Sequence, residues 1–499
     1  MSVSAIGSQA ALAVQQLKNL RSQFDDLQRQ LSTGQKSATY AGLGTSSGIT
    51  VGLNAQLSAL SGYDTSIDMV STRISLMSNA LTSMTQVQNT VQSAIDQANS
   101  ASDGSGPGVA QQTAQSSLGQ LLDLLNTQSG GRYLFSGSAT DQPSVDTLDH
   151  ILNGNGAQAG LTQLISERTQ ADLGPPTRVG RLTVASAANA VTVTEDAGPF
   201  GLKLASVTSN LTNVATNGPS GSPASMSVDF SGGNPNPGDS ITVRFNLPDG
   251  TSENVTLTAT TNSPPGTNQF TIGSTPGATA TNFQTALNGA IGTLAATSLT
   301  AASAVVASND FFNADANNPP QRVNGPPFDT ATGMVPGTSS NTVIWYTGEA
   351  GAGSARDTVK AQIDPSLTIS YGARANEAAI RNLVQNVATL AAVQISSTNP
   401  NAAGLSAALN QRLTSNLNST SGQTITDIES DLASAQNAAS NAKTRHQQTS
   451  ATLNDYLQQI TGISNEEVGT ELLTLQTRMQ ASMQTTAMLF QTSLVNYLK

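Results

Sequence analysis

The two ends of this chain carry the same apolar repeat, and the middle does not. Small or apolar residues, with one His and one Thr among them, alternate at spacings of three and four near both termini. They are Ile6, Ala10, Ala13, Leu17, Leu20, Phe24, Leu27 and Leu31, and then Ile425, Ile428, Leu432, Ala435, Ala439, Ala442, His446, Thr449, Leu453, Tyr456 and Ile460. This alternation is the seam with which helices pack in coiled coils. Because termini usually fray, we expect partners to bury these ends, either other copies of the chain or close relatives.

Composition narrows the classes of protein that fit. The 499 residues are 37% hydrophobic, 4% aromatic and 11% charged, with a net charge of −11. The length and the low hydrophobic content indicate a polar chain of several domains with small hydrophobic cores. The negative net charge argues against a nucleic-acid-binding protein, which needs a basic face. The chain has no cysteine, so disulfides and cysteine metal sites are excluded.

Membrane and targeting signals are not evident in the sequence. We see no stretch that approaches the roughly 18–20 apolar residues of a membrane span, and we predict no membrane insertion. Residues 1–13 lack a charged segment followed by an apolar core, so we predict no cleaved signal peptide. If the protein leaves the cell, it is expected to use another export route.

Helical patterns fill the two ends of the chain. Gly34 is the expected left-handed stop of the first helix, Asn376 the expected cap of the first helix after the middle region, and Ser464–Glu467 a capping box. The expected helices cover 1–33, a run from Leu53 to Ile95, a run from Leu118 to Leu125, a run from Ile380 to Leu390, about 402–418, 422–461, and from the capping box to Lys499.

The middle region, about 135–370, alternates short β-like runs with Gly, Pro, Asn and Thr clusters. We predict helices at about 160–173, 201–215 and 280–293, and a turn at Pro248-Asp249-Gly250. Strands are expected at 227–230, 241–245, 254–258, 191–194 and 270–272. The last two each precede an expected helix, which indicates either a duplicated strand–helix unit or two unrelated pieces. The predicted fold class is α+β and multidomain, with the terminal N- and C-helices paired as an elongated helical bundle or coiled coil and a β-rich middle insert.

Candidate chemical motifs are weak. Gly44-Thr-Ser-Ser-Gly48 matches the GxSxG pattern of a nucleophile elbow, but a helix and a polar loop precede it rather than a strand. Gly42-x-Gly44 also misses the spacing of dinucleotide-binding loops. His150 and His446 are the only histidines; His446 falls on the seam, where a polar residue usually sets register, and His150 has no evident partner. The acidic pairs 25–26 and 466–467 suit a solvated face or a helix cap. We therefore predict no catalytic, metal or cofactor site.

Four motifs resemble the bacterial flagellin superfamily, which includes filament flagellins and hook-filament junction proteins. The end of the first helix, Leu27-Gln-Arg-Gln-Leu-Ser-Thr-Gly34, and the final segment, Ala487–Leu498, are similar to the ends of that family. Gly131-Arg-Tyr-Leu-Phe-Ser-Gly137 and Tyr371-Gly-Ala-Arg-Ala-Asn-Glu377 look like the points where the chain leaves and rejoins the inner helices in the junction branch. The segment after Gly34, Ala38–Gly44, departs from the charged stretch of most relatives.

The resemblance implies a non-enzymatic structural protein. Its partners would be neighbouring flagellar subunits, an export chaperone and the flagellar type III export apparatus, and its place would be the extracellular flagellum. Predicted domains are 1–35 with 465–499 for terminal coiled-coil assembly, 36–137 with 371–464 as a helical rod, and 138–370 as a β-rich outer insert, which could form two subdomains. The predicted assembly interface is Leu17, Leu20, Phe24, Leu27, Leu31, Leu472, Leu475, Phe490, Leu494 and Leu498.

Three functions remain open at this stage. The motifs at 131–137 and 371–377 favour the junction branch, and the filament branch is the alternative. A secreted adhesin or enzyme that carries its activity in the middle insert is a second alternative.

Overall fold

The computed structural model describes residues 3–100, 106–396 and 398–497. Long helices stand at both ends of the chain and the strands gather in the middle, so the predicted α+β class is confirmed. The chain divides into two compact units, which we describe separately. The first comprises Met1–Val70, Ala361–Ile369 and Asn437–Lys499, and the second comprises Ser71–Lys360 and Ser370–Gln436.

All but one of the expected helices are present, and two further helices, 148–153 and 300–312, were not predicted. The helices are α1 (Val3–Thr33), α2 (Ser47–Ser100), α3 (Gly106–Leu125), α4 (Leu148–Asn153), α5 (Leu161–Leu173), α6 (Pro276–Leu294), α7 (Thr300–Phe312), α8 (Ala378–Ala392), α9 (Ala402–Leu417), α10 (Ile425–Thr461) and α11 (Asn465–Tyr497). One predicted cap is wrong: Glu377, not Asn376, stands before α8, and its side chain does not cap the helix.

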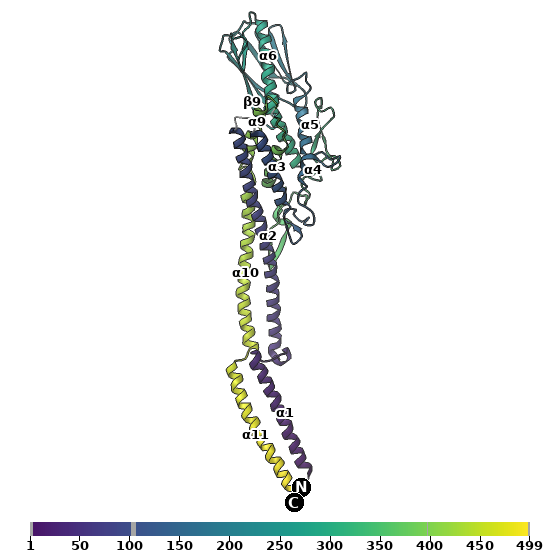
Figure 1. Ribbon diagram of the computed structural model, residues 1–499, viewed down its shortest axis with the longest axis vertical. Coiled ribbons are helices and arrows are strands. Elements are labelled where there is room, and N and C mark those ends of the chain that lie inside the picture. Colours follow the sequence, from purple (N-terminus) through teal and green to yellow (C-terminus); the bar gives the residue numbers. More distant parts are fainter. Residues whose placement is uncertain (1–2, 101–105, 397, 498–499) are drawn as a thin grey trace. The chain divides into compact units, whose positions relative to one another are not determined.

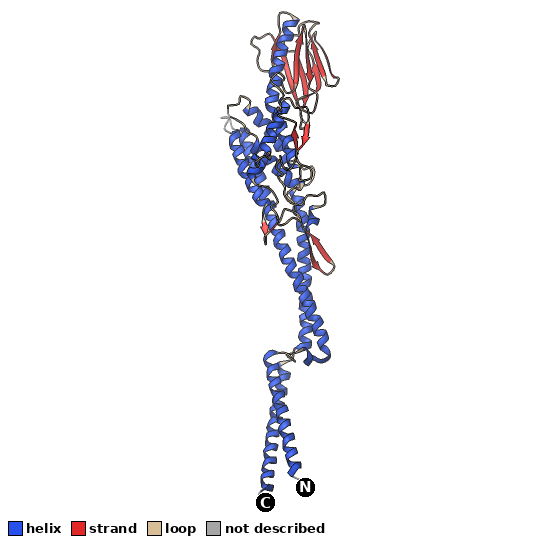
Figure 2. Ribbon diagram, turned by 90° about the vertical axis from the view of Figure 1, so that its right-hand side faces the viewer, coloured by secondary structure: helices blue, strands red, loops and turns tan. Residues whose placement is uncertain are grey.

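The first unit is built from helix pairs. α1 and α11 pack along each other, with both chain ends at the same end of the pair (Figures 1 and 2). The first part of α2 lies against the last part of α10, where Asp64 contacts His446 and Asp68 contacts Lys443. Asp64 precedes Asp68 in α2, whereas its partner His446 follows Lys443 in α10, so these two helices are antiparallel. Most of the hairpin of β13 (Lys360–Asp364) and β14 (Leu367–Ser370) also belongs to this unit.

The second unit contains two four-stranded sheets that pack beside α6. The strands are red in Figure 2. One sheet has the order β3-β4-β7-β6 and is antiparallel; the other has the order β10-β9-β8-β5, with only β10 and β9 parallel. The strands are β3 (Leu182–Ala187), β4 (Ala190–Glu195), β5 (Lys203–Ser209), β6 (Ala215–Ser220), β7 (Ser225–Asp229), β8 (Ser240–Asn246), β9 (Ser252–Thr260) and β10 (Gln269–Thr271). Phe230, Phe270 and Phe283 meet in the core between the sheets and α6.

The predicted strands and turn in this region are confirmed. Each of the five expected strand segments falls largely within a strand, namely β4, β7, β8, β9 or β10. Pro248–Gly250 turns the chain between β8 and β9: the amide of Gly250 donates to the carbonyl of Leu247 over 3.0 Å, and Gly250 has a φ of 81°. A left-handed φ favours glycine at this position.

The helix predicted at 201–215 is wrong, because residues 203–209 form β5. Leu204 and Val207 are three residues apart, which suits a helix. A bulge between Leu204 and Ser206 places Leu204 opposite Phe245 and Val207 opposite Val243, and both partners are buried on the same face of β8. An inserted residue thus gives a strand the spacing of a helix turn. The duplicated strand–helix unit is therefore also wrong.

The membrane expectation needs a partial correction. Residues 276–312 form a continuous helical segment through α6, a π-helical turn (Ala295–Leu299) and α7, and it is long and apolar enough to span a membrane. In the described structure 56% of its most apolar window is buried. Phe283, Ile291 and Phe311 are completely buried within the second unit. The segment is a core helix of this unit.

A second core of the same unit surrounds α8, which packs against α3, α7 and α9. Ile380, Val384 and Val387 are fully buried, and so are most residues of this helix. The apolar face of this helix packs into the core, and its polar residues form a separate stripe. Two small hairpins complete the unit: β1 (Gln128–Ser129) with β2 (Arg132–Tyr133), and β11 (Gln321–Val323) with β12 (Met334–Pro336).

Candidate assembly surface

The end of α1 is set by Gly34, as predicted. The amide of Gly34 donates to the carbonyl of Gln30 over 2.8 Å, and its φ is 66°. The hydroxyl of Thr33 donates to the carbonyl of Arg29 over 2.8 Å and accepts the amide of Gln35 over 3.3 Å. A glycine at the left-handed position ends the helix without the clash of a side chain.

The turn after α1 is bonded to the turn between α10 and α11. The amide of Lys36 donates to the carbonyl of Thr461 over 2.7 Å, and the amide of Ile463 donates to the carbonyl of Gly34 over 3.0 Å. We call these segments, 34–36 and 461–463, the glycine clamp. A Cβ on Gly462 would lie 2.5 Å from the carbonyl oxygen of Gln458, so this position requires glycine. The sequence predicted the stop at Gly34 but not that this turn meets the one at Gly462.

The start of α11 follows directly from the glycine clamp. The amide of Glu467 donates to the hydroxyl of Ser464 over 3.3 Å, which is half of the predicted capping box. Glu466 and Glu467 stand in the first turn, where the helix dipole favours negative charge. Val468 is fully buried and holds this turn in place.

The predicted assembly residues are only partly covered within one chain. Leu17, Leu20, Phe24, Leu27 and Leu472 are half-buried. Leu475 is 6% exposed, whereas Leu31 is 42% exposed. For Phe490 and Leu494 the structure describes only the helical backbone, and Leu498 lies outside the described residues. A pair of helices therefore leaves much of this apolar surface open to solvent.

Further apolar side chains, absent from the predicted set, stand on the outer faces of the same pair. They are Leu12, Val14, Leu473, Met483 and Met488, with exposed fractions from 40% to 67%. Leu12 and Val14 lie off the 3-4 repeat near the N-terminus, which is why that repeat did not indicate them. Apolar residues gathered along one exposed helix pair are typical of a surface that contacts a partner.

His446 lies in the contact between α2 and α10 and is 3% exposed. Its Nδ1 is 2.8 Å from Oδ1 of Asp64, and its Nε2 is 3.7 Å from Oδ2 of Asp364. Arg445 contacts the same Asp364 carboxylate over 3.0 Å. The polar partners agree with the expectation that His446 sets the register of this seam.

In the second unit, the motifs at 131–137 and 371–377 lie side by side. Ser136 and Arg374 form an isolated antiparallel bridge. The amide of Gly137 donates to the carbonyl of Ala373 over 3.0 Å, and the amide of Ala375 donates to that of Phe135 over 2.7 Å. The two connections of the middle region to the helices are thus joined by backbone hydrogen bonds.

Charged groups support this bridge. The amide of Ser138 donates to Oε2 of Glu349 over 2.8 Å, and this hydrogen bond holds the pKa of Glu349 below its ordinary value. Arg374 donates to the carbonyls of Gly351 and Gly353, and Glu377 pairs with Arg356. The bridge is therefore a fixed point of the fold.

No reactive arrangement emerges from the remaining candidates. Within residues 3–100, 106–396 and 398–497, no group of three or more acidic or histidine side chains could hold a metal ion. Gly44–Ser46 belongs to a 3-10 helix (Tyr40–Ser46) that follows a turn rather than a strand, so it lacks the shape of a nucleophile elbow. No partner of His150 was evident from the sequence, but its Nδ1 lies 2.9 Å from Oδ1 of Asp146.

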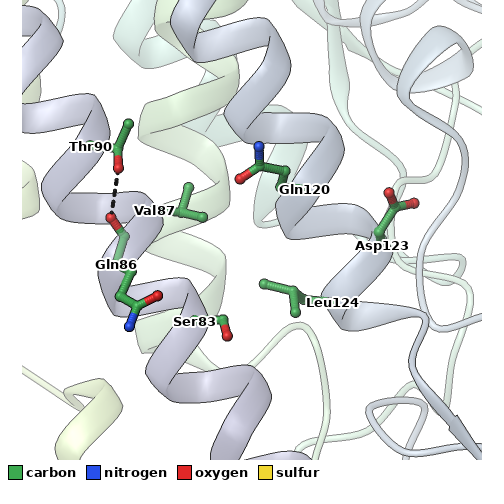
Figure 3. A pocket seen from close by; sticks show the side chains of 7 residues that line it. All are labelled: Ser83, Gln86, Val87, Thr90, Gln120, Asp123 and Leu124. Carbon is green, nitrogen blue, oxygen red and sulfur yellow. Dashed lines mark hydrogen bonds between the residues drawn. The ribbon is translucent and has the colours of Figure 1, made fainter.

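An open groove of about 550 Å³ runs between α2 and α3 (Figure 3). Val87 and Leu124 form its apolar part, and polar side chains line the rest. The hydroxyl of Thr90 donates to the carbonyl of Gln86 over 3.0 Å, so one of these groups is satisfied within α2. Asp123 is the one charged residue among those that line the described groove.

The chain was compared with known protein families. Residues 7–140 match the model described as the bacterial flagellin N-terminal helical region. A search of curated proteins finds no match to the chain. The matched region covers most of α1, all of α2 and α3, and the hairpin β1–β2. This part of the chain is therefore similar to the N-terminal helical region of bacterial flagellin.

Proposed function

We propose that this protein is a subunit of the extracellular bacterial flagellum that self-assembles through α1 and α11 at the junction between hook and filament. The proposal of self-assembly rests on the apolar surface of the α1–α11 pair, which is only partly buried within one chain. Leu17, Phe24 and Leu27 remain partly exposed although α11 packs along α1. Complete burial of one Leu or Phe contributes roughly 1.5–3 kcal/mol, so neighbouring subunits gain substantially by covering several.

The junction position is favoured by the motifs at 131–137 and 371–377. Their resemblance to the junction branch concerns the points where the chain leaves and rejoins the inner helices. Two backbone hydrogen bonds join these points, from Gly137 to Ala373 and from Ala375 to Phe135. This arrangement supports the proposal that residues 138–370 form an outer insert.

Within this proposal the chain has three functional parts. Residues 1–35 with 465–499 form the terminal assembly domain, 36–137 with 371–464 form a helical rod, and 138–370 form the outer insert. The glycine clamp, which pairs residues 34–36 with 461–463, supports the first boundary. The bridge between Ser136 and Arg374 supports the second.

The proposal also includes the route to the flagellum. The subunit is exported unfolded by the flagellar type III apparatus, with a chaperone and without a cleaved signal peptide. The absence of cysteine suits a chain that is threaded through an export channel and exposed outside the cell. Mass spectrometry of the protein in culture supernatant tests this: an N-terminus that begins within the first residues is expected, and a truncated one contradicts the route.

Immunogold electron microscopy distinguishes the junction from the filament. An antibody against the insert is applied to intact flagella. Label at a single point next to the hook is expected for the junction subunit. Label along the whole length identifies a filament subunit instead, and label that is absent from flagella contradicts both positions.

A further inference from the structure

A polar cavity of about 510 Å³ lies in the second unit, among α7, α8, the loop after α9 and the turn between β8 and β9. Its volume is in the range of small-molecule sites. No aromatic side chain is among the described residues that line it. Hydrogen bonds and charge, rather than stacking on a ring, would therefore hold a ligand here. The lining includes Asn309, Asn313, Arg381, Asn382, Gln385 and Ser421.

Arg381 supplies the unbalanced charge of the cavity. Its guanidinium forms no ion pair and no side-chain hydrogen bond with any residue that the structure describes. Burial lowers the pKa of Arg381 below its ordinary value, yet a guanidinium remains protonated in proteins. A half-buried cation with five free donors is suited to a planar oxyanion, which it can bind through two parallel hydrogen bonds.

Gln385 stands one helical turn after Arg381 on α8 and is only 8% exposed. Its side-chain amide also forms no hydrogen bond with a described residue, although it lines the cavity. The amide atoms of Gln385 are not fully enclosed by the protein, so they are accessible from the cavity. An amide offers both a donor and an acceptor, which suits a hydroxyl group of a ligand.

The other charged residues of the cavity determine which ligand charge is favourable there. Asp249 lines the cavity, but its Oδ2 accepts from Nε of Arg412 over 2.6 Å, and this pair is neutral overall. Arg381 therefore gives the cavity lining a net charge of +1. A monoanion matches that charge, whereas a phosphate dianion would add a second negative charge beside Asp249.

We propose that this cavity binds a small hydroxylated carboxylate, such as a sugar acid. Its carboxylate pairs with Arg381, and its hydroxyl groups bond to Gln385 and the surrounding amides. This site does not depend on where in the flagellum the subunit assembles.

The proposal is tested with the purified full-length chain and sodium glucuronate, by ligand-observed saturation-transfer NMR. Saturable binding is expected with a Kd on the order of 1 mM, from the affinity that a ligand of this size reaches per atom. Glucose, which has the hydroxyls without the carboxylate, should bind about tenfold more weakly or not at all. Inorganic phosphate should compete less well than glucuronate.

Three variants make the test specific. Arg381→Gln should weaken glucuronate binding about tenfold or more, and the near-isosteric Gln385→Met should weaken it several-fold. Arg244→Gln, on an exposed position of β8, is the matched control and should bind as the wild type does. Because the side chains of Arg381 and Gln385 form no hydrogen bond or ion pair with the described residues, both variants should keep the wild-type Tm.

Several results overturn the proposal. They are an absence of saturable glucuronate binding, equal binding by Arg381→Gln, equal affinity for glucose, and stronger binding of phosphate than of glucuronate. A large loss of Tm in Arg381→Gln would also overturn it, since that residue would then have a structural partner.

Discussion

At the scale of single residues, the half-buried leucines of α1 are the positions most sensitive to charge. Leu27 lies on the apolar repeat and is partly covered within one chain. We predict that Leu27→Asp abolishes assembly and leaves export intact, because a carboxylate cannot be buried between subunits without a partner. Electron microscopy of the cells and immunoblots of the culture medium measure both. Gln28→Asp, at the adjacent exposed position, is the control; normal flagella in the Leu27→Asp strain would contradict the proposed interface.

Glu349 gives the second residue-scale prediction. The backbone hydrogen bond from Ser138 lowers the pKa of Glu349 in the folded state. A lowered folded-state pKa stabilises the fold above the unfolded pKa of about 4.3, and this contribution is lost as pH falls through the folded-state value. We therefore expect Glu349→Gln to reduce the urea midpoint at pH 7, and we expect its difference from the wild type to shrink as the pH falls toward about 3. Fluorescence of Trp345, the only tryptophan and fully buried, reports this unit. An equal difference in urea midpoint between variant and wild type at both pH values would contradict this link between the pKa of Glu349 and stability.

The residues that sequence reasoning could identify are those whose role shows in local spacing. His446 was recognised as polar on an apolar seam, but its partner Asp64 is 382 positions away in the chain. Arg381 and Gln385 were not recognised at all, because a helix pattern gives no sign that a charged side chain will lack a partner. Such residues become visible only when α7, α8 and the loop after α9 are placed together.

At the scale of elements, periodicity predicted the long helices well and failed where the backbone is irregular. α1 and α10 carry an uninterrupted repeat over many turns, and the glycine and capping signals at the ends of α1 and α11 are local. β5 has apolar residues at helical spacing because a bulge between Leu204 and Ser206 brings both Leu204 and Val207 to one face. The bulge is imposed by the pairing with β8, so the segment itself does not reveal it.

The glycine clamp supports a prediction at the same scale. Gly34 has a φ of 66°, which costs other L-residues about 1–2 kcal/mol. We expect Gly34→Ala to weaken the clamp and to speed hydrogen exchange at the amides of Lys36 and Ile463, which donate its two bonds. Gly52→Ala is the control, since Gly52 is exposed inside α2 with open space around its Cα, and alanine should stabilise a helix there by about 0.5–1 kcal/mol. Unchanged exchange at both amides in Gly34→Ala would contradict the clamp.

At the scale of the whole molecule, the order of helices, β-rich middle and helices was predictable because each part has a distinct residue pattern. The two-sheet arrangement of the middle region was not predictable in this way. The strands of its second sheet come from segments as far apart as 203–209 and 269–271, and β10 pairs in parallel while its neighbours are antiparallel. The order of such strands depends on the packing of both sheets against α6 rather than on any single strand.

The two units differ in how deeply their helices are buried. This leads to a last prediction, on how the protection of backbone amides from hydrogen exchange changes when subunits assemble. In a single chain, Leu31 and Leu473 on the α1–α11 pair are 42% and 67% exposed, whereas most residues of α8 are buried. Hydrogen exchange requires local opening, which is least costly where few apolar contacts are lost. In the monomer we therefore expect fast exchange along α1 and α11 and slow exchange along α8. Assembly should slow exchange in α1 and α11 by at least about tenfold and leave α8 unchanged, because only the exposed pair gains contacts. Hydrogen–deuterium exchange of monomer and polymer, with α8 as the internal reference, measures this, and equal protection of α1 in both states would place the subunit contacts elsewhere.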